Sequence, residues 1–415
     1  MNMLEQFEKA KKASRNLALI ADARRDEVLL AVADAIAENE EEILAANSKD
    51  LSKMDRENPL YDRLQLTPKR LHDIASDMRK VVSLPSPLGR VLKDTTLPNG
   101  LHLRRVSVPF GVIGMVYEAR PNVTFDVFAL CFKSGNACVL KGGRDADESN
   151  KAIVSLIHKV LSDNGIDTGV VQLLPGTHEA TAEMLSAVGY IDVCIPRGGR
   201  RLIDFVRDNA KVPVIETGAG VVHAYFDKDA DLAMGTRIIN NAKTRRVSVC
   251  NALDCLLIHQ SRLCDLPEIA KPLAMSNVKI WADNQSFVAL EGNYPQELLL
   301  HATEDSFGTE YMSYAMAIKT VDSLDAAISH ISQFGSGHSE CIITGNADAA
   351  IAFQTQVDAS CVYVNAPTSF TDGGQFGLGA EIGISTQKLG PRGPMSLEEI
   401  TTYKWLIDGN GQIRS

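Results

Sequence analysis

The segment RIINNAKTRRVSVCNALDCLLIHQ, residues 237–260, decides how the fold and the chemistry of this chain are interpreted. Its first part, Arg237–Arg246, has helical spacing, and Leu253–His259 is an apolar run typical of a strand. Cys250 lies in the short loop between them. Binding and catalytic side chains favour such loops, because the flanking elements aim them while the loop leaves them accessible. The segment therefore predicts a helix, a functional loop and a strand.

The alternative for any single cysteine is a buried side chain that packs as a small apolar group. Arg245 and Arg246 favour the reactive interpretation, because nearby positive charge stabilises a thiolate relative to a thiol. Cys250 is therefore the candidate nucleophile.

Composition limits the class of protein. A chain of 415 residues is long enough for two or more domains with sizeable cores. The hydrophobic share of 45% and the charged share of 23% are ordinary for a soluble globular protein. The net charge of −10 argues against a nucleic-acid surface and suits a protein that acts on small molecules.

The cysteines are widely spaced and include no CxxC pair, so neither a metal site nor a disulfide framework is predicted. They are Cys131, Cys138, Cys194, Cys250, Cys255, Cys264, Cys341 and Cys361. The N-terminus lacks the apolar core of a signal peptide, and no apolar run is long enough to span a membrane. We expect a soluble, cytoplasmic protein with reduced thiols, no membrane partner and no nucleic-acid partner.

The N-terminal region predicts helices followed by a hairpin. Residues 3 to about 56 have helical apolar spacing, and a further helix is expected over 67–82 because Thr67-Pro68 is a helix-start signal. In TLPNGLHLRRVSV, residues 96–108, the Asn-Gly pair between alternating apolar residues predicts a β-hairpin. We expect this hairpin to be an oligomerisation element, with an ordinary surface flap as the alternative.

Strands and helices then alternate from Pro109, which is the pattern of an open, mainly parallel sheet that binds ligands beyond the carboxyl ends of its strands. The expected strands are FGVIGMVYE, NACVLKGG, GVVQLLPG, YIDVCIPRGG and VPVIETG. Three of the loops that follow them carry small, polar or basic residues, each with at least one glycine, although no GxGxxG is present. Glycines before a helix let backbone N–H groups approach an anion. The candidate nucleotide-binding residues in these loops are Lys141, Arg144, Gly176, Gly198 and Gly199.

A second alternation begins near Asp231 and runs to Asn365, with expected strands at CLLIHQ, VKIWAD, YAMAIKTV, ECIITG and CVYVNA. The chain is therefore expected to have three regions. Residues 1–228 form the N-terminal helices and the cofactor-binding domain, and residues 229–365 form the catalytic domain that carries Cys250. Residues 366–415 are a glycine-rich loop, expected to close over the substrate, and a tail that returns to the cofactor domain and the oligomer interface. The tail sequence YKWLIDGNGQIR is expected to form strand, turn and strand.

Six long motifs, in this order along the chain, resemble the aldehyde dehydrogenase superfamily. They are YEARPNVTFDV (117–127), KSGNACVLKGG (133–143), IPRGG (195–199), SVCNALD (248–254), VDSLDAAISHISQFGSGHSECI (321–342) and FGLGAEIGIST (376–386). The resemblance implies an α/β, aldehyde-dehydrogenase-like fold with a Rossmann-type cofactor domain, a second α/β catalytic domain and a small β-hairpin oligomerisation element. Within the superfamily, the chain most resembles the branch that reduces L-glutamyl 5-phosphate to L-glutamate 5-semialdehyde with NADPH, in L-proline biosynthesis.

The chemistry implied by this resemblance uses Cys250 and Asn122. The thiolate attacks the acyl phosphate and expels phosphate, and the resulting thioester is reduced by hydride from the nicotinamide. The Asn122 amide and the Cys250 backbone N–H are the implied oxyanion donors. Lys141 and Arg144 lie where the superfamily binds the adenosine ribose, and a guanidinium there would pair with the 2′-phosphate of NADPH.

The remaining site residues are less specific. Glu216 corresponds to the glutamate that hydrolytic members use to activate water; we group it with the cofactor-binding residues and expect a structural or proton-relay role. Arg120, His338 and Ser339 are candidate substrate-binding residues, and either Asp305 or Glu310 would hold the nicotinamide ribose. The superfamily branch leads us to expect an arginine where this chain has Ser369, after an added Pro367.

Other interpretations stay open at this stage. A relative that reduces another acyl phosphate or an acyl-CoA fits the same residues, and a Cys250–His338 pair would suit an acyl transferase or hydrolase. The Asn99-Gly100 hairpin and the tail from Tyr403 to Arg414 predict a homodimer or higher homo-oligomer, because exposed strand edges are usually covered by a partner. An association with glutamate 5-kinase stays open.

Overall fold

The computed structural model describes residues 2–58, 61–118 and 120–414, so Ala119 of the YEARP motif lies outside it. The chain divides into two compact units. Unit 1 comprises Met1–Thr217, Gly377–Gly383 and Pro394–Ser415, and unit 2 comprises Gly218–Phe376 and Ile384–Gly393. The expected boundary at residue 228 differs from the observed one at Thr217, because the strand His223–Phe226 belongs to the sheet of unit 2.

Apart from the short helix α4, which was not expected, the helices of unit 1 lie in the regions where helices were expected. They are α1 (Met3–Leu17), α2 (Asp22–Glu38), α3 (Glu40–Leu51), α4 (Tyr61–Leu64), α5 (Pro68–Ser83), α6 (Asn122–Lys133), α7 (Asp147–Asp163), α8 (His178–Ser186) and α9 (Arg200–Asn209). Thr67 is the N-cap of α5, as expected, and its hydroxyl accepts the Arg70 N–H at 3.2 Å. Unit 1 also contains the short 3-10 helices η1 (Arg144–Ala146) and η2 (Thr168–Val170).

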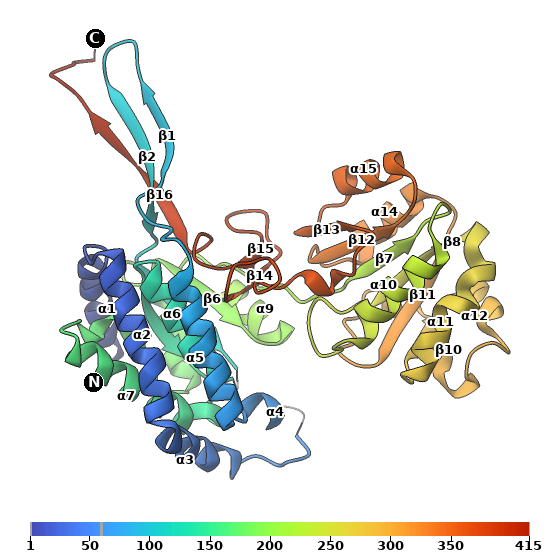
Figure 1. Cartoon of the computed structure of the whole chain (residues 1–415), viewed down its shortest axis with the longest axis horizontal. Helices are drawn as coiled ribbons and strands as arrows, with labels where there is room; N and C mark the ends of the chain where they lie inside the picture. Colours follow the sequence, from blue (N-terminus) through green and yellow to red (C-terminus); the bar gives the residue numbers. More distant parts are fainter. Residues whose placement is uncertain (1, 59–60, 119, 415) are drawn as a thin grey trace. The chain divides into compact units, whose positions relative to one another are not determined.

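A four-stranded parallel sheet forms the centre of unit 1. Its order is β5-β4-β3-β6, from β3 (Val112–Tyr117), β4 (Ala137–Lys141), β5 (Val171–Leu173) and β6 (Val193–Arg197). Alternate residues face opposite sides, so Ile113 and Met115 pack with α2, α5, α6 and α7, whereas Val112 and Val116 pack with α8 and α9. Figure 1 shows this arrangement of helices around the sheet.

The expected strand VPVIETG is wrong. The segment contains only isolated bridge residues, Val214 and Thr217. Val214 pairs with Cys194 of β6, and the neighbouring Pro213 has no N–H to continue a ladder. The Pro213 carbonyl still accepts the Cys194 N–H at 2.8 Å, so this segment lies along the edge of the sheet without becoming part of it.

A three-stranded antiparallel sheet stands away from the rest of unit 1 (Figure 1). Its order is β1 (Val91–Thr96), β2 (His102–Pro109) and β16 (Thr401–Asp408). We call this sheet the arm. The hairpin therefore begins at Val91 rather than at 96, and a five-residue connection, 97–101, joins its strands. The expected second strand of the C-terminal tail is wrong, because the chain after Asp408 pairs with nothing in the described tail up to residue 414.

Unit 2 is built on a seven-stranded parallel sheet in the order β10-β9-β11-β8-β7-β12-β13. The strands are β7 (His223–Phe226), β8 (Cys255–His259), β9 (Lys279–Ala282), β10 (Leu299–His301), β11 (Ala315–Val321), β12 (Ser339–Ile343) and β13 (Cys361–Val364). The helices are α10 (Leu232–Thr244), α11 (Leu266–Met275), α12 (Asn284–Leu290), α13 (Glu304–Phe307), α14 (Leu324–Phe334) and α15 (Ala347–Gln356), with 3-10 helices η3 (Gln260–Asp265), η4 (Gln296–Leu298) and η5 (Thr368–Phe370).

The two faces of this sheet are covered by different helices. Phe226, Leu256 and Ile258 pack towards α10 and α11, whereas Tyr225 and Leu257 pack towards α14 and α15. β14 (Gly383–Ser385) and β15 (Gly393–Met395) form a further two-stranded sheet. Among the described residues, no helix is long and apolar enough to cross a membrane.

Candidate active site

The four parallel strands of unit 1 end in loops that carry most of the predicted nucleotide-binding residues. Asn122 follows β3, Lys141 ends β4, Gly176 follows β5, and Gly198 and Gly199 follow β6. Because carboxyl ends of parallel strands meet at one edge of a sheet, residues that are far apart in the sequence share that edge.

Lys141 and Arg144 lie together at this edge. Lys141 is buried, and burial lowers the pKa of its amine, with the positive charge of Arg144 lowering it further. Arg144 is exposed at the start of η1. A Cβ placed on Gly176 would lie 3.2 Å from the Arg144 Cα, so glycine lets the loop after β5 approach the loop after β4. The three predicted residues are therefore neighbours.

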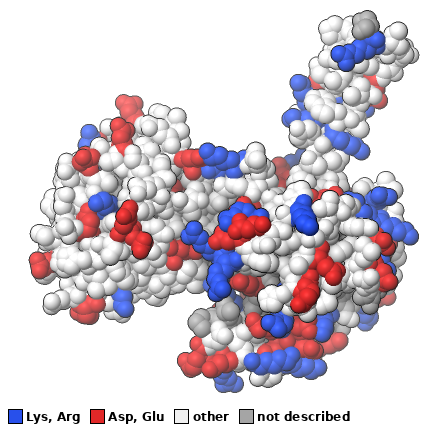
Figure 2. All heavy atoms as spheres, turned by 180° about the vertical axis from the view of Figure 1, so that it is seen from behind, with Lys and Arg blue, Asp and Glu red and all other residues white. Residues whose placement is uncertain are grey.

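The loop after β6 already holds an anion from the chain itself. The Gly199 N–H, at the N-terminus of α9, donates to the Glu118 carboxylate at 2.9 Å. A helix N-terminus attracts negative charge. Figure 2 shows acidic and basic side chains interspersed on the displayed face. Sequence reasoning missed Glu118, although it lies directly after β3 in the YEARP motif.

Asn122 and Glu216 have defined partners in unit 1. The Asn122 amide donates to the Asp126 carboxylate at 3.1 Å, one turn along α6, which fixes the orientation of the amide. Burial raises the pKa of Asp126 to about 6. Glu216 Oε2 lies 3.7 Å from a guanidinium nitrogen of Arg207 on α9. Arg120 precedes α6, and its carbonyl accepts the Val123 N–H at 3.0 Å.

Cys250, in unit 2, lies in the loop between α10 and β8 and is half-buried. The next residue anchors this loop: the Asn251 amide donates to the Thr371 carbonyl at 2.9 Å, and the Thr368 hydroxyl donates to the Asn251 carbonyl at 2.9 Å. We call residues 368–371 the strap. Arg245 and Arg246, the basic neighbours predicted from sequence, are both exposed.

Gly220 is in close contact with the Cys250 backbone. A Cβ built on Gly220 would lie 1.6 Å from the Cys250 carbonyl oxygen and 2.6 Å from its carbonyl carbon. Only glycine permits this approach. The Gly220 N–H donates to the Glu310 carboxylate at 3.0 Å, which links Glu310, one of the two ribose candidates, to the Cys250 loop. Asp305, the other candidate, belongs to α13. The sequence signal that could have indicated this close contact was the pair of glycines, Gly218 and Gly220, in TGAG.

Ser369 belongs to the strap. Its hydroxyl donates to the Asn241 side chain on α10 at 3.0 Å, and the residue is buried. Where the superfamily branch leads us to expect an arginine, this chain therefore has a side chain that joins the strap to the helix before Cys250.

His338 and Ser339 connect to the strap. His338 Nδ1 lies 2.8 Å from the Ser339 hydroxyl, which lies 2.7 Å from the Thr371 hydroxyl. His338 is fully buried, and burial lowers its pKa to about 4, so the ring is neutral near pH 7. Its Nε2 has no hydrogen-bond partner among the described residues.

A buried Lys243–Asp254 pair supports the base of the same loop. Lys243 Nζ donates to the Leu253 carbonyl at 2.8 Å and lies 3.9 Å from Asp254. Burial lowers the pKa of Lys243 to about 8 and raises that of Asp254 to about 7, and each charge partly offsets the effect of burial on the other. The Tyr311 N–H donates to Asp254 at 3.0 Å. These polar contacts hold both ends of the Cys250 loop.

Comparison with known proteins adds independent information. A model described as the aldehyde dehydrogenase family matches residues 2–280. The gamma-glutamyl phosphate reductase of Bacteroides thetaiotaomicron is 60% identical over 413 residues, which cover 100% of this chain and 99% of the relative. That of Bacteroides fragilis is 59% identical over 414 residues, which cover 100% of both chains.

Solved structures agree. The crystal structure of gamma-glutamyl phosphate reductase from Thermotoga maritima is 40% identical, covers 100% of both chains and superposes with a TM-score of 0.96. An acetylating aldehyde dehydrogenase from Geobacillus thermoglucosidasius, 17% identical with 99% of this chain and 97% of that chain covered, has a TM-score of 0.70 and shares the fold. The expected α/β, aldehyde-dehydrogenase-like fold is therefore confirmed.

Proposed function

Because this chain belongs to the aldehyde dehydrogenase family, we propose that it reduces L-glutamyl 5-phosphate to L-glutamate 5-semialdehyde and phosphate with NADPH, a step of L-proline biosynthesis. The observation that carries the proposal is the similarity, over the whole chain, to proteins named gamma-glutamyl phosphate reductase.

In this proposal Cys250 Sγ attacks the acyl carbon, a C–S bond forms, and the C–O bond to phosphate breaks. Phosphate is a good leaving group, so this step needs no strong acid. The Asn122 amide and the Cys250 backbone N–H are the proposed donors to the developing oxyanion. The nicotinamide, when bound, supplies the hydride that reduces the thioester. Breaking the C–S bond then returns Cys250 as a thiolate.

The carboxyl edge of the unit 1 sheet suits a nicotinamide dinucleotide. Lys141 is a buried amine at a strand end, and Gly176 keeps the neighbouring loop free of a side chain. Gly198 and Gly199 precede α9, whose N-terminus already holds the Glu118 carboxylate. We propose that this edge binds the cofactor and that Glu216, held near Arg207, has a structural role at its border.

Arg144 is proposed to set the preference for NADPH over NADH. A guanidinium–phosphate contact contributes roughly 1.5–3 kcal/mol, or about one to two decades in affinity. Arg144→Glu should therefore lower kcat/KM for NADPH by about 10- to 100-fold and leave that for NADH unchanged or improved, because only NADPH carries the extra phosphate. Steady-state kinetics with both cofactors measure the ratio.

Lys159→Glu is the matched control, since Lys159 is exposed on α7 and its substitution changes the net charge by the same amount. Its NADPH to NADH ratio should equal that of the wild type. An unchanged ratio in Arg144→Glu would show that the guanidinium does not meet the 2′-phosphate.

The reaction itself is tested in the oxidative direction, with glutamate semialdehyde, NADP and phosphate, by absorbance of the reduced nicotinamide. The proposal requires the absorbance to rise only when phosphate is present. A rise with coenzyme A in place of phosphate would favour an acyl-CoA reductase, and a rise with neither would indicate hydrolytic oxidation.

A Cys250–His338 acyl transferase or hydrolase is less well supported. A general base at neutral pH must accept a proton, and the lowered pKa of His338 makes it a weak base. Its position beside Ser339 and the strap suits a role in shaping the substrate site, which we propose for His338, Ser339 and Arg120.

The arm is proposed to mediate assembly into a homodimer or higher oligomer. Large apolar side chains are exposed on it, including Val91, Tyr403, Trp405 and Ile407. Exposed apolar surface and open strand edges are usually covered by a partner. Sedimentation at micromolar concentration should give a mass of two or more chains for the wild type and a lower mass for Trp405→Glu. A monomeric wild type would contradict the proposal.

An association with glutamate 5-kinase is also proposed, because the acyl phosphate that passes between the two enzymes is labile. Co-sedimentation of the two purified proteins tests it.

A further inference from the structure

The centre of unit 2 contains a row of polar side chains on a face of the sheet that is otherwise apolar. Cys255, His223 and Glu340 are register neighbours on the adjacent strands β8, β7 and β12. All three are fully buried and face α14, on the side where Tyr225, Leu257 and Ile342 form the core. An apolar core gains nothing from three ionisable groups unless they bind something or pair with one another.

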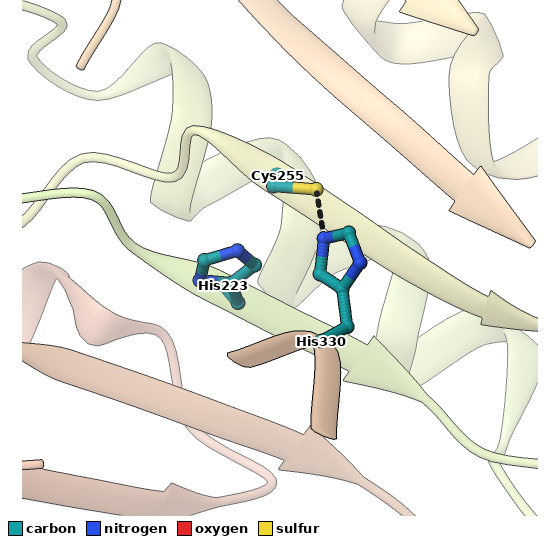
Figure 3. Close-up of side chains that lie close together, drawn as sticks. All are labelled: His223, Cys255 and His330. Atoms are coloured by element: carbon teal, nitrogen blue, oxygen red, sulfur yellow. Dashed lines mark hydrogen bonds between the residues drawn. The ribbon is translucent and has the colours of Figure 1, made fainter. Parts of the chain in front are cut away.

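α14 contributes a fourth member to this row. His330 lies on the buried side of that helix, and its Nε2 is 3.9 Å from Cys255 Sγ. Figure 3 shows His223, Cys255 and His330 close together, with the Cys255 sulfur directed at the His330 ring. One ligand atom from each of these three residues lies within 4.8 Å of the other two.

We propose that His223, Cys255 and His330 form a zinc-binding site between α14 and the sheet of unit 2. Two imidazoles and a thiolate are a ligand set that zinc favours. Tetrahedral geometry with Zn–S and Zn–N bonds of about 2.3 and 2.0–2.1 Å places sulfur and nitrogen about 3.6 Å apart. The observed separation of 3.9 Å between Cys255 Sγ and His330 Nε2 needs an adjustment of a few tenths of an ångström. The His223 nitrogen lies within 4.8 Å of these two atoms, so its ring must move further, by up to about an ångström, to complete the site.

Several buried polar atoms of the cluster have no hydrogen-bond partner among the described residues, which favours a bound ion at this place. His223 Nδ1 lies at ion-pair distance, 3.2 Å, from Glu340 Oε2, but the two atoms do not form a hydrogen bond. Both ring nitrogens of His223 therefore lack a hydrogen-bond partner among the described residues, as does Glu340 Oε1. Buried polar groups are seldom left this way. A small rotation would let Nδ1–H donate to Glu340 while Nε2 binds the metal, which is how carboxylates commonly orient metal-binding histidines.

The ligand charges suit a divalent ion. Cys255 binds zinc as a thiolate after losing its proton to solvent, and both histidines bind as neutral imidazoles, so the thiolate and the neighbouring Glu340 carboxylate together offset the 2+ charge. No electron is transferred, and the three protein ligands leave one coordination position for a small ligand such as water.

His330 lines an open polar cavity of about 440 Å³, together with Lys319, Asp322 and Gln333. The buried cluster therefore borders this cavity through His330. A bound ion would join α14 to the first residues of β7 and β8, and so stabilise unit 2 directly behind the loop that carries Cys250.

The test uses the full-length chain, desalted after incubation with one equivalent of ZnCl₂. Metal analysis should find about one zinc per chain. The thermal midpoint should rise by roughly 5 °C at a zinc concentration about 100-fold above Kd. Cys255→Ser and His330→Asn should each lose both effects; the second variant, at the cavity, covers the case in which the first does not fold.

Two controls separate this site from other thiols. Cys341→Ser changes a buried cysteine that packs on the α10 side of the same sheet, and Cys250→Ser removes the candidate nucleophile; both should keep the zinc and the midpoint shift. A wild type that retains no zinc at micromolar concentration would overturn the proposal, as would equal zinc in Cys255→Ser. Loss of zinc in Cys250→Ser would place the ion at the nucleophile instead.

Discussion

Cys250→Ala should lower the rate of semialdehyde formation by at least about 10⁴-fold while leaving the Kd for NADPH within about twofold of the wild type. The nucleophile and the covalent route are lost together, and single removal of a covalent nucleophile from other enzymes costs this much or more. The cofactor residues proposed above lie in unit 1, so the substitution in unit 2 should spare them. Steady-state kinetics and NADPH titration by calorimetry measure the two quantities.

Cys264→Ala is the matched control for this variant. Cys264 is the exposed thiol in η3 of the same unit, and its loss should change neither quantity. Full activity in Cys250→Ala, or an equal loss in Cys264→Ala, would remove Cys250 from the chemistry.

Gly220→Ala should lower kcat by roughly 100-fold although it adds a single methyl group. That Cβ would lie 1.6 Å from the Cys250 carbonyl oxygen, and a backbone oxygen has no rotamer by which to move away. The Cys250 loop must shift by more than an ångström, and misplacement of that size costs a reaction about 10²-fold. The variant should also unfold at a lower temperature, since overpacking destabilises by about 1–3 kcal/mol.

Gly308→Ala provides the comparison. A Cβ there meets only Phe334, its ring at 3.6 Å and its carbonyl oxygen at 4.0 Å, which are ordinary contacts, so activity and the thermal midpoint should stay near the wild-type values. If Gly220→Ala retained full kcat, the close contact would have no part in positioning Cys250. Measured kcat, rather than KM, decides the outcome, because the displacement acts on the reacting atom.

The sequence by itself determined the α/β alternation, the helix start at Thr67-Pro68 and the loop position of Cys250. These features are local: the period of the apolar residues, capping signals and glycine-containing turns act over a few neighbouring residues. The same local pattern correctly gave five strands of unit 2, in CLLIHQ, VKIWAD, YAMAIKTV, ECIITG and CVYVNA. It also placed Lys141, Arg144 and Gly176 at strand ends, which the parallel order of the sheet then brought to one edge.

Only the tertiary structure decided which of these elements belong together. Four-residue β7 is too short to stand out by period, yet it pairs between β8 and β12 and moves the boundary to Thr217. VPVIETG has the composition of a strand but lies at a sheet edge, where it forms only isolated bridges, because Pro213 has no N–H with which to continue a ladder.

The contact of Gly220 with Cys250 and the cluster of His223, Cys255 and His330 likewise join residues that no local spacing connects. In a parallel sheet, adjacent strands are separated in sequence by whole crossovers, so residues that touch across the sheet are coupled only after the chain has folded. The sequence supplied the reactive groups, and the order of the strands decided which of them meet.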